Sequence, residues 1–191
     1  MRCLLCGKWT LRLICKTCTE LVSITPNCRE IDGFKVYGFF AYDDIAPLLH
    51  AKYSVFGSKI YAFLAKRAAN FLKTRLEIPH NAYCVGVDDQ ISKQGYAHNA
   101  ILLHYFKTAG LCPLYRTLYA SNAVKYAGKD LRFRQKKPRN FILKRKVAGK
   151  KIVLVDDIVT TGLTLKEAKN FLESKGAEVL YALVLANARE C

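Results

Sequence analysis

An acidic pair followed by a threonine-rich loop is the part of this sequence that points most directly to chemistry. Asp156 and Asp157 come after an apolar run, and the residues that follow combine hydroxyl groups with backbone freedom: Thr160, Thr161, Gly162, Leu163 and Thr164. Hydroxyls and the unpaired N–H groups of a helix N-terminus bind phosphate, whereas paired carboxylates suit sugar hydroxyls or a metal ion. The segment therefore predicts a site for a phosphorylated sugar.

The same segment also has an interpretation without a ligand. In that interpretation a threonine at 160 or 161 caps the following helix, and the two aspartates form a turn. We favour the ligand site because the run 153–165 keeps one order throughout: a buried strand, an acidic pair, and a loop that opens a helix. In an open parallel sheet, ligands bind beyond the carboxyl ends of the strands.

Four cysteines near the N-terminus form two C-x₂-C pairs, Cys3 with Cys6 and Cys15 with Cys18. This spacing brings four thiolates onto one ion, and a tetrahedral Zn²⁺ is the ion that such a set favours. An iron–sulfur cluster and redox disulfides are the alternatives, because the same ligands permit both. Because a segment this short cannot build its own core, its folding would depend on the bound metal. We therefore predict a zinc-ribbon module over 1–30 and a main domain over 31–191. The ribbon either binds nucleic acid or braces the neighbouring domain.

Positive charge is concentrated between residues 125 and 151, where Asp130 is the only acid. Aromatic residues are interleaved with the cations, and aromatic faces beside cations suit the stacked bases of a single strand. We therefore predict contacts with single-stranded DNA from Lys125, Lys129, Arg132, Phe133, Arg134, Lys136, Lys137 and Arg139. A solvated loop that its aromatic residues anchor to the core is the alternative.

The composition agrees with a basic globular protein. The net charge is +16, which attracts polyanions such as nucleic acid, although plain solubility is an alternative reason for it. No apolar run approaches the roughly 18 residues that span a bilayer, and the first residues lack the features of a signal peptide. We therefore expect a soluble cytoplasmic protein with no transmembrane segment.

Alternating strand and helix patterns predict an α/β fold, with a parallel sheet flanked by helices. The expected strands are 33–42, 83–87, 151–155 and 179–186, and the expected helices are 58–76, 98–109 and 163–174. The segment 116–146 has weak periodicity and contains the breakers Gly128 and Pro138, so we predict a long loop there. The sheet would present the acidic pair at the carboxyl end of a buried strand.

The run 153–165 resembles the signature of type I phosphoribosyltransferases for 5-phosphoribosyl-1-pyrophosphate (PRPP). The resemblance implies that Asp156 and Asp157 contact the ribose hydroxyls, directly or through Mg²⁺. It implies that both are the catalytic carboxylates if transfer occurs, and that residues 160–164 cradle the 5′-phosphate. The fold expected from it is the type I phosphoribosyltransferase-like α/β fold.

The whole chain resembles the ComF family of natural-competence proteins, on the Cys₄ ribbon, a central Gly-aromatic-x-x-Asn element, Arg139-Asn140 and the phosphoribose loop. Members of that family combine a zinc finger with a phosphoribosyltransferase domain and are linked to the entry of transforming single-stranded DNA into the cytoplasm. The resemblance implies PRPP, Mg²⁺ and single-stranded DNA as ligands, and membrane-associated DNA-uptake machinery as a partner at the inner face of the membrane. The central element departs from the family pattern, because residues 94–99 read Gln-Gly-Tyr-Ala-His-Asn where Arg-Gly-Phe-Asn is usual. Nucleobase salvage by a phosphoribosyltransferase is the alternative function.

Overall fold

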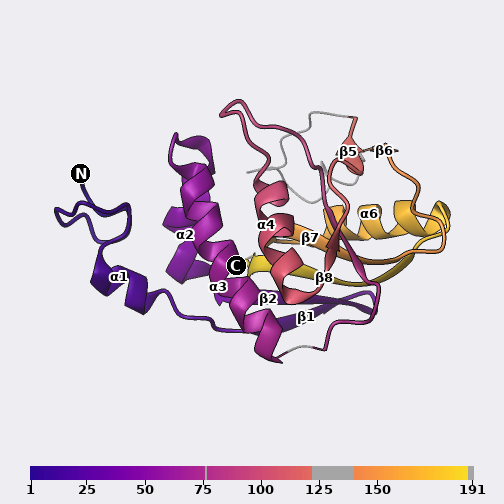
Figure 1. Cartoon of the computed structure of the whole chain (residues 1–191), viewed down its shortest axis with the longest axis horizontal. Helices are drawn as coiled ribbons and strands as arrows, with labels where there is room; N and C mark the ends of the chain where they lie inside the picture. The colour runs from indigo at the N-terminus through magenta and orange to yellow at the C-terminus, as the bar shows by residue number, and fades with distance from the viewer. Residues whose placement is uncertain (76, 122–139, 189–191) are drawn as a thin grey trace.

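A six-stranded sheet with the strand order β1-β2-β8-β7-β3-β4 forms the centre of the molecule (Figure 1). The computed structural model describes residues 1–75, 77–121 and 140–188. The strands of the sheet are β1 (Asn27–Ile31), β2 (Phe34–Ala41), β3 (Tyr83–Gly86), β4 (Cys112–Pro113), β7 (Lys151–Val159) and β8 (Glu178–Asn187). Neighbouring strands are parallel except β1, which pairs with β2 in the antiparallel direction.

Helices cover both faces of this sheet and bury two separate cores. One face carries α2 (Tyr42–His50), the 3₁₀ turn η1 (Ala51–Tyr53), α3 (Gly57–Arg75), α4 (His98–Phe106) and a second 3₁₀ turn, η2 (Lys107–Ala109); the other carries α6 (Leu163–Ser174). Successive strand residues point to opposite faces. Val153 and Val155 of β7 accordingly lie in the core under α3, and Ile152 and Leu154 in the core under α6.

The predicted fold class, a parallel sheet flanked by helices, is confirmed. The expected helices and strands are present with small shifts at their ends, and β1 and α2 are additional elements that the sequence patterns did not reveal. The largest shift is in β7, which continues past the predicted end at residue 155 to Val159. The acidic pair therefore lies inside a strand and does not form a turn.

The prediction of one long loop over 116–146 is wrong at both ends of that segment. Leu118–Ala120 (β5) and Phe141–Leu143 (β6) pair in the antiparallel direction, and Leu118 and Phe141 are buried in the core that α6 covers. Three-residue strands are too short to show a periodicity, so their pairing is set by tertiary contacts. The predicted DNA contacts Lys125, Lys129, Arg132, Phe133, Arg134, Lys136, Lys137 and Arg139 lie outside the described residues.

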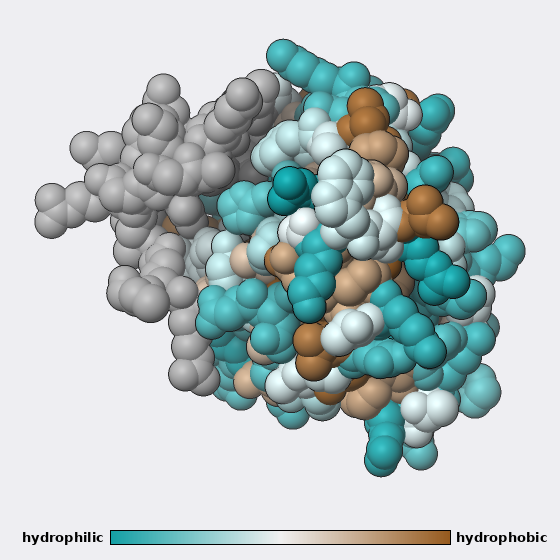
Figure 2. All heavy atoms as spheres, turned by 90° about the vertical axis from the view of Figure 1, so that its left-hand side faces the viewer, coloured by the Kyte–Doolittle hydropathy of each residue, from teal (hydrophilic) through white to brown (hydrophobic). Residues whose placement is uncertain are grey.

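The N-terminal segment packs against α3 through α1 (Lys16–Leu21). Ile14 and Val22 are buried in the same core as α3, and the Arg67 guanidinium of α3 donates a hydrogen bond to the Thr19 carbonyl at 3.4 Å. Figure 2 faces this end of the molecule and shows apolar side chains among hydrophilic ones. The division at residue 30 stays a prediction, and β1, which spans it, belongs to the main sheet. Among the described residues, no helix combines the length and the apolar character needed to cross a membrane.

Candidate functional site

The ends of β3 and β7 create the place where a ligand can enter this sheet. After β3 the chain passes through α4 toward β4, at one edge of the sheet, and after β7 it passes through α6 to β8, in the opposite direction. The two crossovers leave the sheet on opposite faces, so a crevice opens between the strands at this topological switch point. A cavity of about 300 Å³ lies there.

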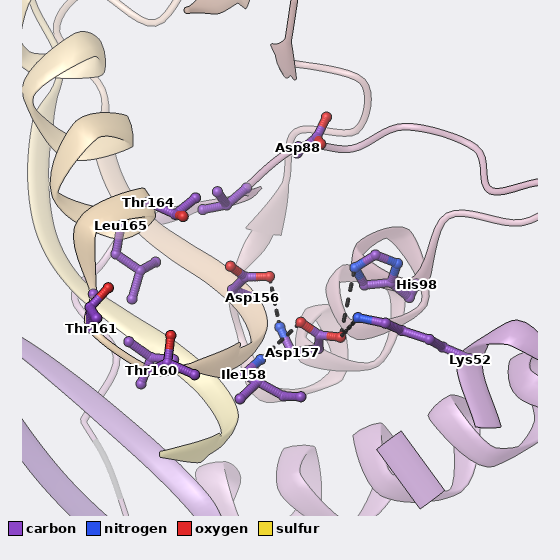
Figure 3. A pocket seen from close by; sticks show the side chains of 13 residues that line it. Lys52, Asp88, His98, Asp156, Asp157, Ile158, Thr160, Thr161, Thr164 and Leu165 are labelled. Carbon is purple, nitrogen blue, oxygen red and sulfur yellow. Dashed lines mark hydrogen bonds and ion pairs between the residues drawn. The ribbon is translucent and has the colours of Figure 1, made fainter. Parts of the chain in front are cut away.

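The cavity joins the predicted loop to residues from three other segments (Figure 3). It is lined by Lys52, Val87, Asp88, His98, Asp156, Asp157, Ile158, Val159, Thr160, Thr161, Gly162, Thr164 and Leu165. The predicted residue Leu163 is the first residue of α6 and is not among this lining set. All the other predicted phosphoribose residues are brought together around one volume.

Asp157 is the buried member of the acidic pair, with 6% of its surface exposed. Its Oδ2 accepts hydrogen bonds from Lys52 Nζ at 2.9 Å and from Tyr61 Oη at 2.8 Å, and His98 Nε2 lies 4.0 Å away. Burial opposes ionisation of this carboxyl, but the neighbouring His98 and Lys52 and these hydrogen bonds hold its pKa well below the usual range. Asp157 is therefore ionised at neutral pH and binds Lys52 and Tyr61 as a structural residue.

The protonation states of its neighbours follow from the same geometry. Burial lowers the pKa of His98 below its ordinary value, despite the nearby Asp157, so the imidazole is neutral at about pH 7. For Lys52, burial opposes the charge but Asp157 outweighs it and raises the pKa of the ammonium group. Lys52 is therefore the cation of this cluster.

Asp156 has a different position from its neighbour. Its Oδ1 accepts a hydrogen bond from the Asp157 N–H at 2.9 Å, and the side chain lies between the Lys52 end of the cavity and the threonine loop (Figure 3). The two carboxylates diverge because adjacent residues of a strand point to opposite sides. Ligand oxygens and nitrogens of Asp156, Asp157 and His98 lie within 4.8 Å of one another. Asp156 lies nearer the threonine loop (Figure 3), and its carboxylate oxygens are of the kind that fit Mg²⁺, which prefers oxygen ligands.

The threonine loop, residues 160–164, is supported by side chains of β1. The Arg29 guanidinium donates a hydrogen bond to the Thr160 carbonyl, and Ile31 packs under Gly162. Gly162 is the N-cap residue of α6 and has a φ of 81°, in the left-handed region that favours glycine. Gly162 has no side chain to cap the helix, and the Thr161 hydroxyl accepts a long hydrogen bond, at 3.5 Å, from the Leu163 N–H. The N-terminus of α6 and the threonine hydroxyls beside it are the kind of group that binds an anion.

Replacement of Gly162 by alanine is expected to distort the loop. A Cβ at this position would lie 2.1 Å from Cδ1 of Ile31, and the positive φ adds strain of about 1 kcal/mol. We expect the unfolding midpoint in urea to fall and binding of inorganic phosphate to be lost. Gly149→Ala is the matched control, because Gly149 also has a positive φ, of 71°, with nothing within 4 Å of its Cβ position. Retained phosphate binding in Gly162→Ala would contradict the assignment of the loop.

Three residues of the site escaped the sequence analysis: Lys52, Tyr61 and His98. Lys52 and Tyr61 reach Asp157 across 105 and 96 residues of sequence, so no local spacing signals them. His98 lies in the central element, where the departure from the ComF pattern drew attention to the segment but not to this side chain. The buried Asn99 beside it donates a hydrogen bond to the Val87 carbonyl at 2.6 Å and so ties α4 to the end of β3.

The four N-terminal cysteines form a second cluster, with all sulfur atoms within 4.8 Å of one another. The Cys6 and Cys15 sulfurs are 3.8 Å apart, and ligands of a tetrahedral Zn²⁺ with Zn–S bonds near 2.3 Å are separated by about 3.8 Å. Burial of the Cys3 thiol is outweighed by N–H groups that lower its pKa to about 6, whereas hydrogen bonding with Cys6 and burial raise the pKa of Cys18 to about 12. Crowded thiolates of this kind need a bound cation, so the cluster fits a Zn²⁺ ion.

Comparisons with known proteins point to the same cavity. Residues 115–191 match the family described as "Phosphoribosyl transferase domain". The orotate phosphoribosyltransferase of Sulfurisphaera tokodaii is 43% identical over 49 residues, which cover 26% of this chain and 25% of that protein. The orotate phosphoribosyltransferase of Methanopyrus kandleri is 48% identical over 44 residues, 23% of this chain and 24% of that protein. The chain thus matches about a quarter of the length of these relatives.

Among solved structures, matches to parts of the chain have low sequence identity. A hypoxanthine phosphoribosyltransferase from Staphylococcus aureus is 18% identical, with a TM-score of 0.43, over 70% of this chain and 68% of that chain. The HGPRT-ase from Leishmania tarentolae in complex with GMP is 18% identical, with a TM-score of 0.38, over 70% and 66%.

The matched segment 115–191 contains the strand, the acidic pair and the threonine loop that line the cavity. With its sheet of mostly parallel strands between two layers of helices, the chain has the type I phosphoribosyltransferase fold, preceded by four clustered cysteines.

Proposed function

We propose that this protein binds PRPP together with Mg²⁺ in the cavity at the ends of β3 and β7. The observation that carries the proposal is the order of groups along the cavity. The α6 N-terminus and its threonines suit a phosphate, and Asp156 beside them suits vicinal hydroxyls. A ribose 5-phosphate unit carries the same two kinds of group next to each other, the phosphate on C5 and the hydroxyls on C2 and C3.

The chemistry that this arrangement can support is transfer at C1 of the ribose. The bond from C1 to the diphosphate oxygen breaks, its electron pair leaves with the diphosphate, and an acceptor nucleophile bonds to C1. Asp156 stabilises the positive charge that develops on the ribose, while Asp157 stays bound to Lys52 and Tyr61 and holds the end of β7 in place. Asp156 would hold Mg²⁺, which would supply neutralisation of the diphosphate charge.

We also propose that the protein handles single-stranded DNA, in natural transformation, with membrane-associated uptake machinery as its partner. The net charge of +16 supports this role. So do the described basic residues that follow β6, Lys144, Arg145 and Lys146, all of which are exposed. The resemblance to the ComF family gives the role its biological setting. Zn²⁺ in the cysteine cluster would be structural.

Nucleobase salvage is the second candidate function, because the matched relatives are named orotate phosphoribosyltransferases. It leaves the cysteine cluster and the basic charge without a purpose. Release of pyrophosphate from PRPP on addition of orotate, hypoxanthine or another plain base would favour salvage over DNA handling.

The substitution Asp156→Asn tests the PRPP site. We expect titration calorimetry with PRPP and Mg²⁺ to show an affinity about 10- to 100-fold weaker than that of the unmodified protein, because hydrogen bonds to a charged group are lost. Asp44→Asn on α2 is the matched control, since Asp44 is exposed and lies outside the cavity lining. Equal affinity in Asp156→Asn and Asp44→Asn would refute the site.

The same titration in the presence of saturating single-stranded DNA tests the second part of the proposal. A changed PRPP affinity means that the two ligands are thermodynamically coupled. DNA binding that is absent, or unaffected by salt, contradicts a DNA-handling role, because contacts to phosphates release counterions.

A further inference from the structure

Lys52 occupies the end of the cavity that faces the threonine loop across Asp156 (Figure 3). It comes from η1, which precedes α3 and lies far in sequence from both the loop and the acidic pair. Thr160, Thr161 and Thr164 lie at the other end. PRPP likewise carries its two anionic groups at opposite ends of the ribose, the phosphate on C5 and the diphosphate on C1. We propose that Lys52 binds the diphosphate of PRPP and that Tyr96 positions Lys52 for this contact.

This inference rests on the proposed function, because it assigns the diphosphate half of the same ligand. With the 5′-phosphate on the loop and the ribose hydroxyls at Asp156, the C1 substituent is directed toward the opposite end of the cavity. Lys52 and His98 are the residues drawn there, and their nitrogen atoms both face Asp157 (Figure 3).

The charges of the described side chains favour Lys52 as the group that attracts a diphosphate at this end of the cavity. Three carboxylates line it, those of Asp88, Asp156 and Asp157. Within the described part of the chain, Lys52 is the only lysine or arginine in the lining, and His98 beside it is neutral because it is buried. Lys52 is therefore the described side chain whose charge can attract a diphosphate at this end, in addition to the proposed Mg²⁺.

Lys52 can bind an anion and keep its hydrogen bond to Asp157. An ammonium group has three N–H donors, and the hydrogen bond to Asp157 at 2.9 Å uses one of them. The Lys52 side chain is 25% exposed, whereas that of Asp157 is 8% exposed, so the ammonium group is the more open partner of the pair. Tyr61 and the Ile158 N–H also donate hydrogen bonds to Asp157, so this carboxylate does not depend on Lys52 alone.

The loop after β3 fixes the backbone from which Lys52 projects. Tyr96 Oη donates a hydrogen bond to the Lys52 carbonyl at 2.8 Å, and Gln94 Nε2 donates one to the Tyr53 carbonyl at 3.0 Å. Gly57, at the start of α3, leaves the room for this contact, because a Cβ there would lie 2.0 Å from Tyr96 Oη. Residues 94–99, which lack the arginine usual in the ComF pattern, thus support the backbone of Lys52 in η1.

The test compares two ligands that differ only in the diphosphate, PRPP and ribose 5-phosphate, by titration calorimetry with Mg²⁺. We expect Lys52→Met to weaken PRPP binding by about 10- to 100-fold, because a charge-assisted contact is lost, and to leave ribose 5-phosphate binding unchanged within about twofold. Lys52→Arg should recover most of the PRPP affinity. Lys66→Ala is the control for loss of one positive charge, since Lys66 is exposed on α3 and outside the cavity.

Tyr96→Phe provides an independent measurement that keeps every charge. We expect a several-fold loss of the preference for PRPP over ribose 5-phosphate, because one hydrogen bond to the Lys52 backbone is removed. Equal weakening of both ligands in Lys52→Met would overturn the inference and assign Lys52 to the support of Asp157 alone, as would unchanged binding of both. If the unmodified protein binds neither ligand, the proposed function fails and this inference fails with it.

Discussion

Removal of metal by a zinc chelator is expected to unfold residues 1–22 while the central sheet stays folded. The segment has few buried residues of its own, and two of them, Cys3 and Cys18, belong to the cysteine cluster. Structural Zn²⁺ contributes about 10 kcal/mol or more to the folding of modules of this size. The two cores on the faces of the sheet consist mostly of residues outside this segment, so the sheet should stay folded.

Trp9 makes this unfolding measurable, because it is the only tryptophan in the chain. It lies in the cysteine module, where the Arg2 guanidinium sits 5.7 Å from its ring centroid, so its fluorescence should change when the module unfolds. Elemental analysis should find one zinc per chain, and none in Cys18→Ser. Cys28→Ser is the control, since Cys28 is exposed in β1 and outside the cluster. Iron with visible absorbance would replace the zinc assignment by an iron–sulfur cluster.

Binding of the module to α3 gives the chelation experiment a second readout. Ile14 and Val22 share a core with α3, and Arg67 hydrogen-bonds to the Thr19 carbonyl. Loss of the module exposes this side of α3, so the melting temperature of the remaining domain should fall by a few degrees. This coupling favours a bracing role for the cysteine module.

The elements around the site could be predicted where their patterns are long. The apolar spacing of α3 and the buried runs of β7 and β8 extend over many residues, so periodicity identifies them. Short elements give no such signal. β1 has five residues in an alternating half-buried pattern, yet it supplies Arg29 and Ile31, which contact the threonine loop.

The different positions of the two aspartates could not be predicted from the local sequence. In the sequence, Asp156 and Asp157 are equivalent, and the family resemblance predicts that both contact the ribose or its metal ion. The end of β7 separates them: both side chains line the cavity, but Asp157 turns toward Lys52 of η1 and Tyr61 of α3, whereas Asp156 lies nearer the threonine loop (Figure 3). The partners that decide this difference, Lys52 and Tyr61, are fixed by the packing of distant helices, which is a tertiary property.

Asp157→Ala is therefore expected to destabilise the fold, whereas Asp156→Asn should leave stability nearly unchanged. Removal of Asp157 leaves Lys52 and the buried Tyr61 hydroxyl without their shared acceptor. Breaking a buried ion pair costs about 3 kcal/mol or more, and we expect the lower end of that range because Lys52 is partly open to solvent. Urea unfolding at neutral pH measures the difference between the two variants and the unmodified protein.

The pH dependence of this difference identifies its cause. Folding lowers the pKa of Asp157, so its stabilising contribution is complete above the unfolded-state value of about 3.9 and is lost as the pH falls toward the lower folded-state pKa. The gap in unfolding free energy between the unmodified protein and Asp157→Asn, which conserves the side-chain volume, should therefore be constant from about pH 7 to 5 and shrink below about pH 4. A gap that is the same at both ends of this range would show that packing, and not the charge of Asp157, holds the end of β7 against Lys52 and Tyr61.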